Sequence, residues 1–206
     1  MVDLIERGAE MATTELPRPI TSEKPTAREV WEHLEPPTGF RAELLRGEVI
    51  LSPTPADIHN HICSRLGLML AQVALENDWD VTNTQTIVLP KTEEGVVPDL
   101  IVIPSESMLT GDWQKEPDDL LLVAEITSSS SRDRDLEVKL ASYAAAGIPM
   151  YLLVDLFDHD GSVTLHSQPN EQDGYLERTT VLFGGKLHLP QPFDMDIDTT
   201  KFGSKK

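Results

Sequence analysis

Residues 120–156 read LLLVAEITSSSSRDRDLEVKLASYAAAGIPMYLLVDL and contain two apolar runs separated by an amphipathic segment. The runs 120–127 and 150–156 are almost continuously apolar, as expected for strands that are covered on both faces. Between them, residues 133–146 begin with acidic side chains and end before Gly147, which is typical of a helix closed by a left-handed glycine. This order predicts an α/β domain with both strands near the centre of its sheet.

Further elements are expected on both sides of this stretch. Residues 41–51 predict a hairpin that turns at Arg46-Gly47, because glycine tolerates the positive φ that such turns need. Apolar side chains at spacings of three and four predict a long helix over residues 56–76. Additional strands are expected over residues 80–89, 97–103, 162–167 and 175–183.

The domain boundaries follow from composition and from one helix start. Thr26 and Glu29 have the spacing of a capping box, so the first helix should begin there and reach Leu34. With 206 residues, the chain is short for two independent cores. We therefore expect one domain over residues 26–190, a flexible N-terminal tail over residues 1–25 and a C-terminal tail over residues 191–206.

The overall charge restricts the classes of partner. The chain has 35 acidic and 17 basic residues, a formal net charge of −18, which opposes nucleic-acid binding over much of the surface. No run approaches the ~18 apolar residues that a membrane span needs, and no secretion signal is recognisable. We expect a cytoplasmic protein without a membrane partner. Cys63 is the single cysteine, so an intramolecular disulfide is excluded.

Two acidic residues interrupt apolar strands and need compensation. A carboxylate in such a strand costs several kcal/mol to desolvate unless a metal, a cation or hydrogen bonds compensate it. Asp99 lies in VVPDLIVI and Glu125 lies in LLLVAEIT. Carboxylates from neighbouring strand ends are ligands that Mg²⁺ or Mn²⁺ prefers, and such an ion promotes phosphodiester hydrolysis. The structural alternatives are a backbone hydrogen bond for Asp99 and an ion pair for Glu125.

Several segments carry a resemblance to a known family. Pro98-Asp99 followed by Glu125 resembles the motif of the PD-(D/E)XK nucleases. The segments ELLRGEVILSP with a following His59, VVPDLIVI, VAEITS and DLEVKLASYAAAGIPMYLLVD occur in the order seen in the Uma-two family of restriction endonuclease-like proteins. The resemblance implies a restriction-endonuclease-like PD-(D/E)XK fold, in which a central mixed β-sheet is flanked by helices.

The resemblance also implies a function and a set of site residues. It implies a Mg²⁺- or Mn²⁺-dependent endonuclease with DNA as substrate, in which Asp99 and Glu125 hold the metal and Glu43 is a further acidic ligand. The usual lysine position, two residues after the glutamate, is Thr127 here, and the usual proline is Ser129. The catalytic lysine is then Lys139 in the following helix.

Alternatives remain open for single residues and for the whole chain. Lys139 has a solvated helix lysine as its plain interpretation, and Glu43 an exposed strand glutamate. The chain as a whole has two rivals to the DNA endonuclease: an inactive binding or assembly module with a nuclease-like fold, and a nuclease acting on RNA or a small phosphodiester. A homodimer is compatible with each of these three functions. We further expect like-charge repulsion to make Asp99→Asn stabilising without metal, and Lys139→Ala to leave folding almost unchanged.

Overall fold

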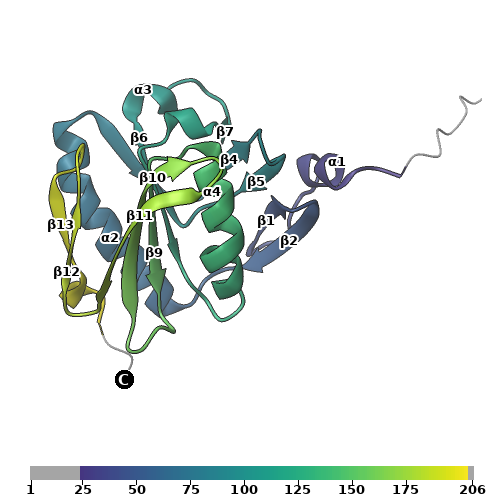
Figure 1. Cartoon of the computed structure of the whole chain (residues 1–206). Helices are drawn as coiled ribbons and strands as arrows, with labels where there is room; N and C mark the ends of the chain where they lie inside the picture. Colours follow the sequence, from purple (N-terminus) through teal and green to yellow (C-terminus); the bar gives the residue numbers. More distant parts are fainter. Residues whose placement is uncertain (1–23, 204–206) are drawn as a thin grey trace, which may run out of the picture.

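The computed structural model describes residues 24–203 and contains a central six-stranded sheet. The strand order is β11-β10-β9-β8-β6-β3, with β8 and β9 parallel and the other neighbours antiparallel. Figure 1 shows β9, β10 and β11 of this sheet side by side. The strands are β3 (Trp79–Thr82), β6 (Leu100–Pro104), β8 (Leu122–Ile126), β9 (Met150–Asp155), β10 (Ser162–Asn170) and β11 (Gly174–Leu182). This confirms the central mixed β-sheet.

Two smaller sheets complete the strand set of the described residues. A five-stranded sheet has the order β2-β1-β5-β4-β7, and a hairpin is formed by β12 and β13. These strands are β1 (Phe40–Leu45), β2 (Glu48–Pro53), β4 (Thr86–Leu89), β5 (Glu94–Val96), β7 (Gln114–Lys115), β12 (Lys186–Leu189) and β13 (Met195–Asp198). The predicted turn between β1 and β2 is confirmed, because Arg46 and Gly47 both have positive φ, 49° and 75°.

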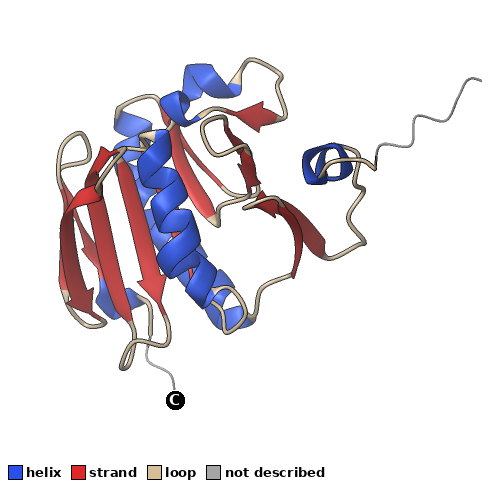
Figure 2. Ribbon diagram, turned by 45° about the vertical axis from the view of Figure 1, so that its right-hand side comes forward, coloured by secondary structure: helices blue, strands red, loops and turns tan. Residues whose placement is uncertain are grey.

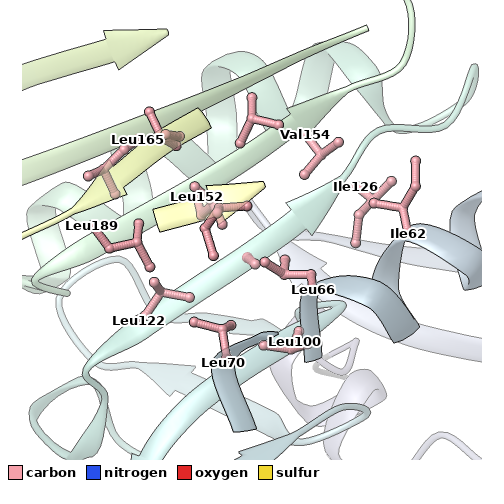
Figure 3. Packing of buried hydrophobic residues seen from close by; sticks show 14 of the residues in the cluster. Ile62, Leu66, Leu70, Leu100, Leu122, Ile126, Leu152, Val154, Leu165 and Leu189 are labelled. Atoms are coloured by element: carbon pink, nitrogen blue, oxygen red, sulfur yellow. The ribbon is translucent and has the colours of Figure 1, made fainter. Parts of the chain in front are cut away.

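Helices cover both faces of the central sheet (Figure 2). The two faces of β8 enter different cores. Leu122, Ala124 and Ile126 pack with side chains of α2 (Asp57–Glu76), as Figure 3 shows for Ile62 and Leu66. Val123 points to the opposite face of β8, into a second core beside the helical residues 134–146. Each buried leucine, isoleucine or valine side chain of this kind contributes about 1.5–3 kcal/mol. Among residues 24–203, no helix has the length and apolar character to cross a membrane.

The helix predicted over residues 133–146 is present but begins irregularly. Its first part, Arg134–Lys139, forms a π-helix, and α4 (Leu140–Ala146) continues it. Gly147 closes α4 in the left-handed region at φ 82°, as predicted. Wide π turns often occur at functional sites, and this one ends at Lys139.

The first helix packs against strand β1. Thr26 and Glu29 form the predicted capping box of α1 (Ala27–Glu32). The Trp31 indole donates a hydrogen bond to the Ala42 carbonyl, 3.1 Å away, and its ring covers Gly95. A Cβ at Gly95 would lie 2.3 Å from that ring, so the close approach requires glycine. Short elements complete the list: α3 (Ser105–Met108) and the 3-10 turns Pro117–Asp119 and Thr199–Lys201.

Two expectations about the chain need correction. The single strand expected over residues 80–89 is two strands in different sheets, because the chain turns between β3 and β4, where Thr84 has a φ of 61°. The C-terminal tail expected from residue 191 instead packs on the core, since Phe193, Ile197 and Phe202 are buried. The expected N-terminal tail, residues 1–25, lies outside the described residues except for its last two positions.

Candidate active site

Lys139 is the centre of a buried cluster of acidic side chains. Its Nζ lies 2.8 Å from Glu125 Oε1 and 2.9 Å from Glu43 Oε1. A third carboxylate, that of Asp135, lies 3.8 Å from the same nitrogen. The Lys139 side chain is only 2% exposed, so the interpretation as a solvated helix lysine is wrong. The ammonium bridges acids from two strands and from its own helix.

Hydrogen bonds fix both carboxylates that Lys139 bridges. Glu125 Oε1 also accepts a 2.7 Å hydrogen bond from the Tyr143 hydroxyl, one turn after Lys139. Glu43 Oε1 accepts a 2.9 Å hydrogen bond from the Val97 amide. Glu43 is 1% exposed, so it is not the exposed strand glutamate of the plain interpretation. The helical segment that carries Lys139 therefore meets strands β1 and β8 at one buried point.

Asp99 lies beside this cluster and has three partners of its own. Arg41 Nη1 donates to Asp99 Oδ1 over 2.8 Å, and His59 Nε2 donates to Asp99 Oδ2 over 2.9 Å. The Ile126 amide also donates to Asp99 Oδ2, over 2.9 Å. This contact places Asp99 next to the backbone of Glu125, in continuation of the β6–β8 register.

The position two residues after Glu125 has a structural role. Thr127 is 0% exposed, and its hydroxyl donates to Asp155 Oδ1 over 3.1 Å and accepts from the Leu156 amide over 3.0 Å. Asp155 in turn accepts hydrogen bonds from Nε and Nη2 of Arg132. Thr127 thus links the ends of β8 and β9. A lysine at this position would have a buried ammonium group.

The charges perturb the ionisation of the site residues in different directions. Burial raises the pKa of Glu125 to about 8, although Lys139 acts against this and Asp99 adds to it. Burial alone would lower the pKa of Lys139, yet its three acidic neighbours hold it above its ordinary range. Burial would also raise the pKa of Asp99, but the His59 hydrogen bond and the Arg41 charge hold it well below its usual range. Asp99 is therefore stabilised as an ion, so we now expect its neutralisation to lower stability rather than to raise it.

The carboxylate oxygens of the site are ligands of the kind that a hard divalent cation prefers. These carboxylates, however, already have partners within the protein. Among residues 24–203, no group of three or more histidine, cysteine, aspartate or glutamate side chains is already arranged to hold a metal ion. The site has four carboxyls, from Glu43, Asp99, Glu125 and Asp135, against the permanent cations Arg41 and Lys139. The carboxyls thus outnumber these cations, and Mg²⁺ commonly uses only one or two carboxylates.

A cavity gives access to one side of the site. Its volume is about 300 Å³, and Asp99, Arg41 and His59 line it together with Phe40 and Asn60. The Arg41 side chain remains 28% exposed, so its guanidinium is both a partner of Asp99 and a group that a ligand in the cavity can contact.

The structure brings all four predicted residues together: Asp99 and Glu125 meet through the Ile126 amide, and Lys139 joins Glu43 to Glu125. His59, which the resemblance placed near the site, contacts Asp99. The sequence did not indicate Arg41, whose partner is 58 residues away. One available signal was its position two residues before Glu43 in the same strand, since alternate residues share a face.

The fold is that of an α/β protein of the restriction-endonuclease-like type. The family model Uma2, described as "Putative restriction endonuclease", matches residues 28–200. The chain belongs to this family. A solved structure from Anabaena variabilis ATCC 29413, described as "a putative nuclease belonging to DUF820", is similar to it with a TM-score of 0.67 and 16% sequence identity. The match covers 87% of this chain and 97% of that chain, and it shows the fold. The search of curated proteins gave no match.

Proposed function

We propose that this protein is a metal-dependent nuclease that hydrolyses phosphodiester bonds, with DNA as the first substrate to test and Asp99, Glu125, Glu43 and Lys139 as its site. The observation that carries the proposal is the bridge of Lys139 between Glu43 and Glu125, directly beside Asp99. Burying this many ionisable groups costs folding energy, and such clusters are concentrated at functional sites. Family membership supports the same reaction class.

Each residue has a distinct part in this proposal. Asp99 and Glu125 would hold Mg²⁺ or Mn²⁺, with Glu43 as a further ligand, and the ion would acidify bound water and neutralise phosphate charge. Lys139 fixes the carboxylates of Glu125 and Glu43 and provides a preorganised positive charge for the developing phosphate charge. Arg41, at the cavity wall, can contact the phosphate when it enters.

The direct test is cleavage of plasmid DNA and of a single-stranded oligonucleotide with Mg²⁺ or Mn²⁺. Glu125→Gln keeps the shape of the side chain and should reduce the cleavage rate on the order of a hundredfold, as loss of a preorganised charged group commonly does. The matched control is Glu137→Gln, an exposed glutamate on the helical segment that carries Lys139, which should cleave like the wild type. Equal rates for wild type and Glu125→Gln would contradict the proposed site.

A second candidate function is a binding module without turnover. It is favoured by one observation: the carboxylates of Asp99 and Glu125 already have protein partners in Arg41, His59, Lys139 and Tyr143. A complete absence of cleavage with Mg²⁺ and Mn²⁺, on DNA and on RNA, would favour this candidate over the nuclease.

A further inference from the structure

Three neighbouring cavities lie along helix α2, and the first two are lined by residues of the candidate active site. The first has a volume of about 190 Å³ and is lined by Arg41, His59 and hydroxyls of the serine run 128–131. The second, of about 300 Å³, shares Arg41 and His59 with the first and contains Asp99. The third, of about 530 Å³, shares Asn60 with the second. The shared residues make the three cavities one path, which we call the α2 groove.

In the third cavity of the α2 groove, the helix contributes mainly small side chains beyond Asn60. The lining of the groove runs from Ala56 in the first cavity to Ala71 in the third. Fifteen residues at 1.5 Å per residue correspond to roughly 22 Å of helix. Ser64 and Gly67 lie between these ends and also line the third cavity. A linear ligand that enters at Asp99 can therefore continue along the helix.

The groups in the α2 groove suit an unpaired nucleotide. Phe40 lines the second cavity and is 45% exposed, so its ring is available for stacking. The amide side chains of Asn60 and Asn83 lie in the same cavity and can donate and accept hydrogen bonds at the edge of a base. Stacking on an aromatic ring and hydrogen bonds to base edges are the means by which proteins bind unpaired nucleotides.

The charge of the groove argues against a duplex. Arg41 and His59 are the basic side chains that line its three cavities, and the whole chain has a net charge of −18. Duplex binding depends on many phosphate contacts by lysine and arginine, because these release the condensed counterions. A short unpaired segment can gain part of its affinity from stacking instead, with few phosphate contacts.

We infer that the substrate of this site is single-stranded nucleic acid, with one base on Phe40, the adjoining phosphate at Arg41 and the strand continuing along α2. This inference rests on the proposed function, since it identifies the substrate class of the proposed nuclease. Single-stranded DNA and RNA share the chemistry that the groove recognises, and the 2′-hydroxyl separates them in the experiment.

The test measures binding and cleavage separately. Binding is measured by fluorescence anisotropy in EDTA, with labelled ten-nucleotide single-stranded DNA, the same RNA sequence and the DNA duplex as three probes. A single strand should bind at least tenfold more tightly than the duplex. Phe40→Ala and Ser64→Glu, which puts a negative charge in the third cavity, should each weaken single-strand binding fivefold or more.

Matched controls identify effects unrelated to the groove. Trp113→Ala removes another exposed aromatic ring, 63% exposed, that lines a different cavity. Gln72→Glu adds the same charge as Ser64→Glu at an exposed position on α2 that does not line the groove cavities. Both controls should bind like the wild type. Equal or tighter binding of the duplex, or unchanged binding by Phe40→Ala and Ser64→Glu, would overturn the inference.

The two proposals fail in different ways. Duplex cleavage that needs Glu125 but is unaffected by Phe40→Ala would keep the nuclease and overturn the single-strand inference. Groove-dependent binding of a single strand, with no cleavage of any probe after Mn²⁺ is added, would contradict hydrolysis while supporting the groove as the binding site.

Discussion

Replacing Lys139 by methionine removes the positive charge between Glu43 and Glu125 and keeps a long, unbranched side chain. The ammonium is 2% exposed and lies 2.8 Å and 2.9 Å from the two carboxylates, so little water can replace it. Removing one partner of a buried ion pair typically costs 3–5 kcal/mol, because the remaining charge is left without compensation; we therefore expect Lys139→Met to lower the free energy of unfolding by about 3–5 kcal/mol. The expectation of almost unchanged folding assumed a solvated end to the side chain.

The assay is urea denaturation at pH 7 with EDTA, followed by circular dichroism. Lys91→Met is the matched control, because Lys91 is 54% exposed and lies 3.6 Å from Glu171; this change should cost less than about 1 kcal/mol. The double variant Lys139→Met, Glu43→Gln should recover part of the loss, since it removes the other carboxylate that has lost its partner. A loss below about 1 kcal/mol for Lys139→Met, or no recovery in the double variant, would refute the reasoning.

Three further changes test other parts of the site and the sheet. Asp99→Asn should lower the free energy of unfolding in EDTA by about 1–3 kcal/mol, because Arg41 loses its carboxylate partner; a more stable variant in urea denaturation would restore the repulsion argument. Thr127→Val should cost a similar amount, about 1–3 kcal/mol, since Asp155 loses a donor and a backbone amide loses its acceptor; an unchanged melting temperature would exclude this structural role. Burial lowers the pKa of His166 from 6.5 to about 4, so between these pH values the unfolded state binds more protons than the folded state. The free energy of unfolding should therefore decrease as the pH falls from about 6.5 to 4. His166→Gln should reduce this decrease in melting curves, and an unaltered pH profile would contradict it.

The elements with strong periodicity could be predicted from the sequence. The apolar runs of β8 and β9, the spacing in α2 and the Arg46-Gly47 turn each indicated the observed element. The β12–β13 hairpin could not be recognised, because KLHL and MDID alternate too briefly to indicate strands. Its buried residues, Leu187 and Ile197 among them, become visible only when the fold brings them to the main core.

The acids of the candidate site were predictable, while the network around them was not. Asp99 and Glu125 are conspicuous because a carboxylate in an apolar strand needs a partner. The local sequence of Arg41 places it on the same strand face as Glu43 but does not indicate its contact with Asp99, since that contact depends on how β1 meets the segment just before β6. Local sequence also could not indicate the burial of Lys139, which depends on the π-helix and on the packing of three elements.

The central claim is that Asp99 and Glu125 form a divalent-metal site, and calorimetric titration with Mn²⁺ tests it most directly. The comparison is between wild type and the double variant Asp99→Asn, Glu125→Gln, both shown to be folded by circular dichroism. The account predicts one bound Mn²⁺ per chain in the wild type and none at the same concentrations in the double variant. Equal Mn²⁺ binding by the two proteins would contradict it.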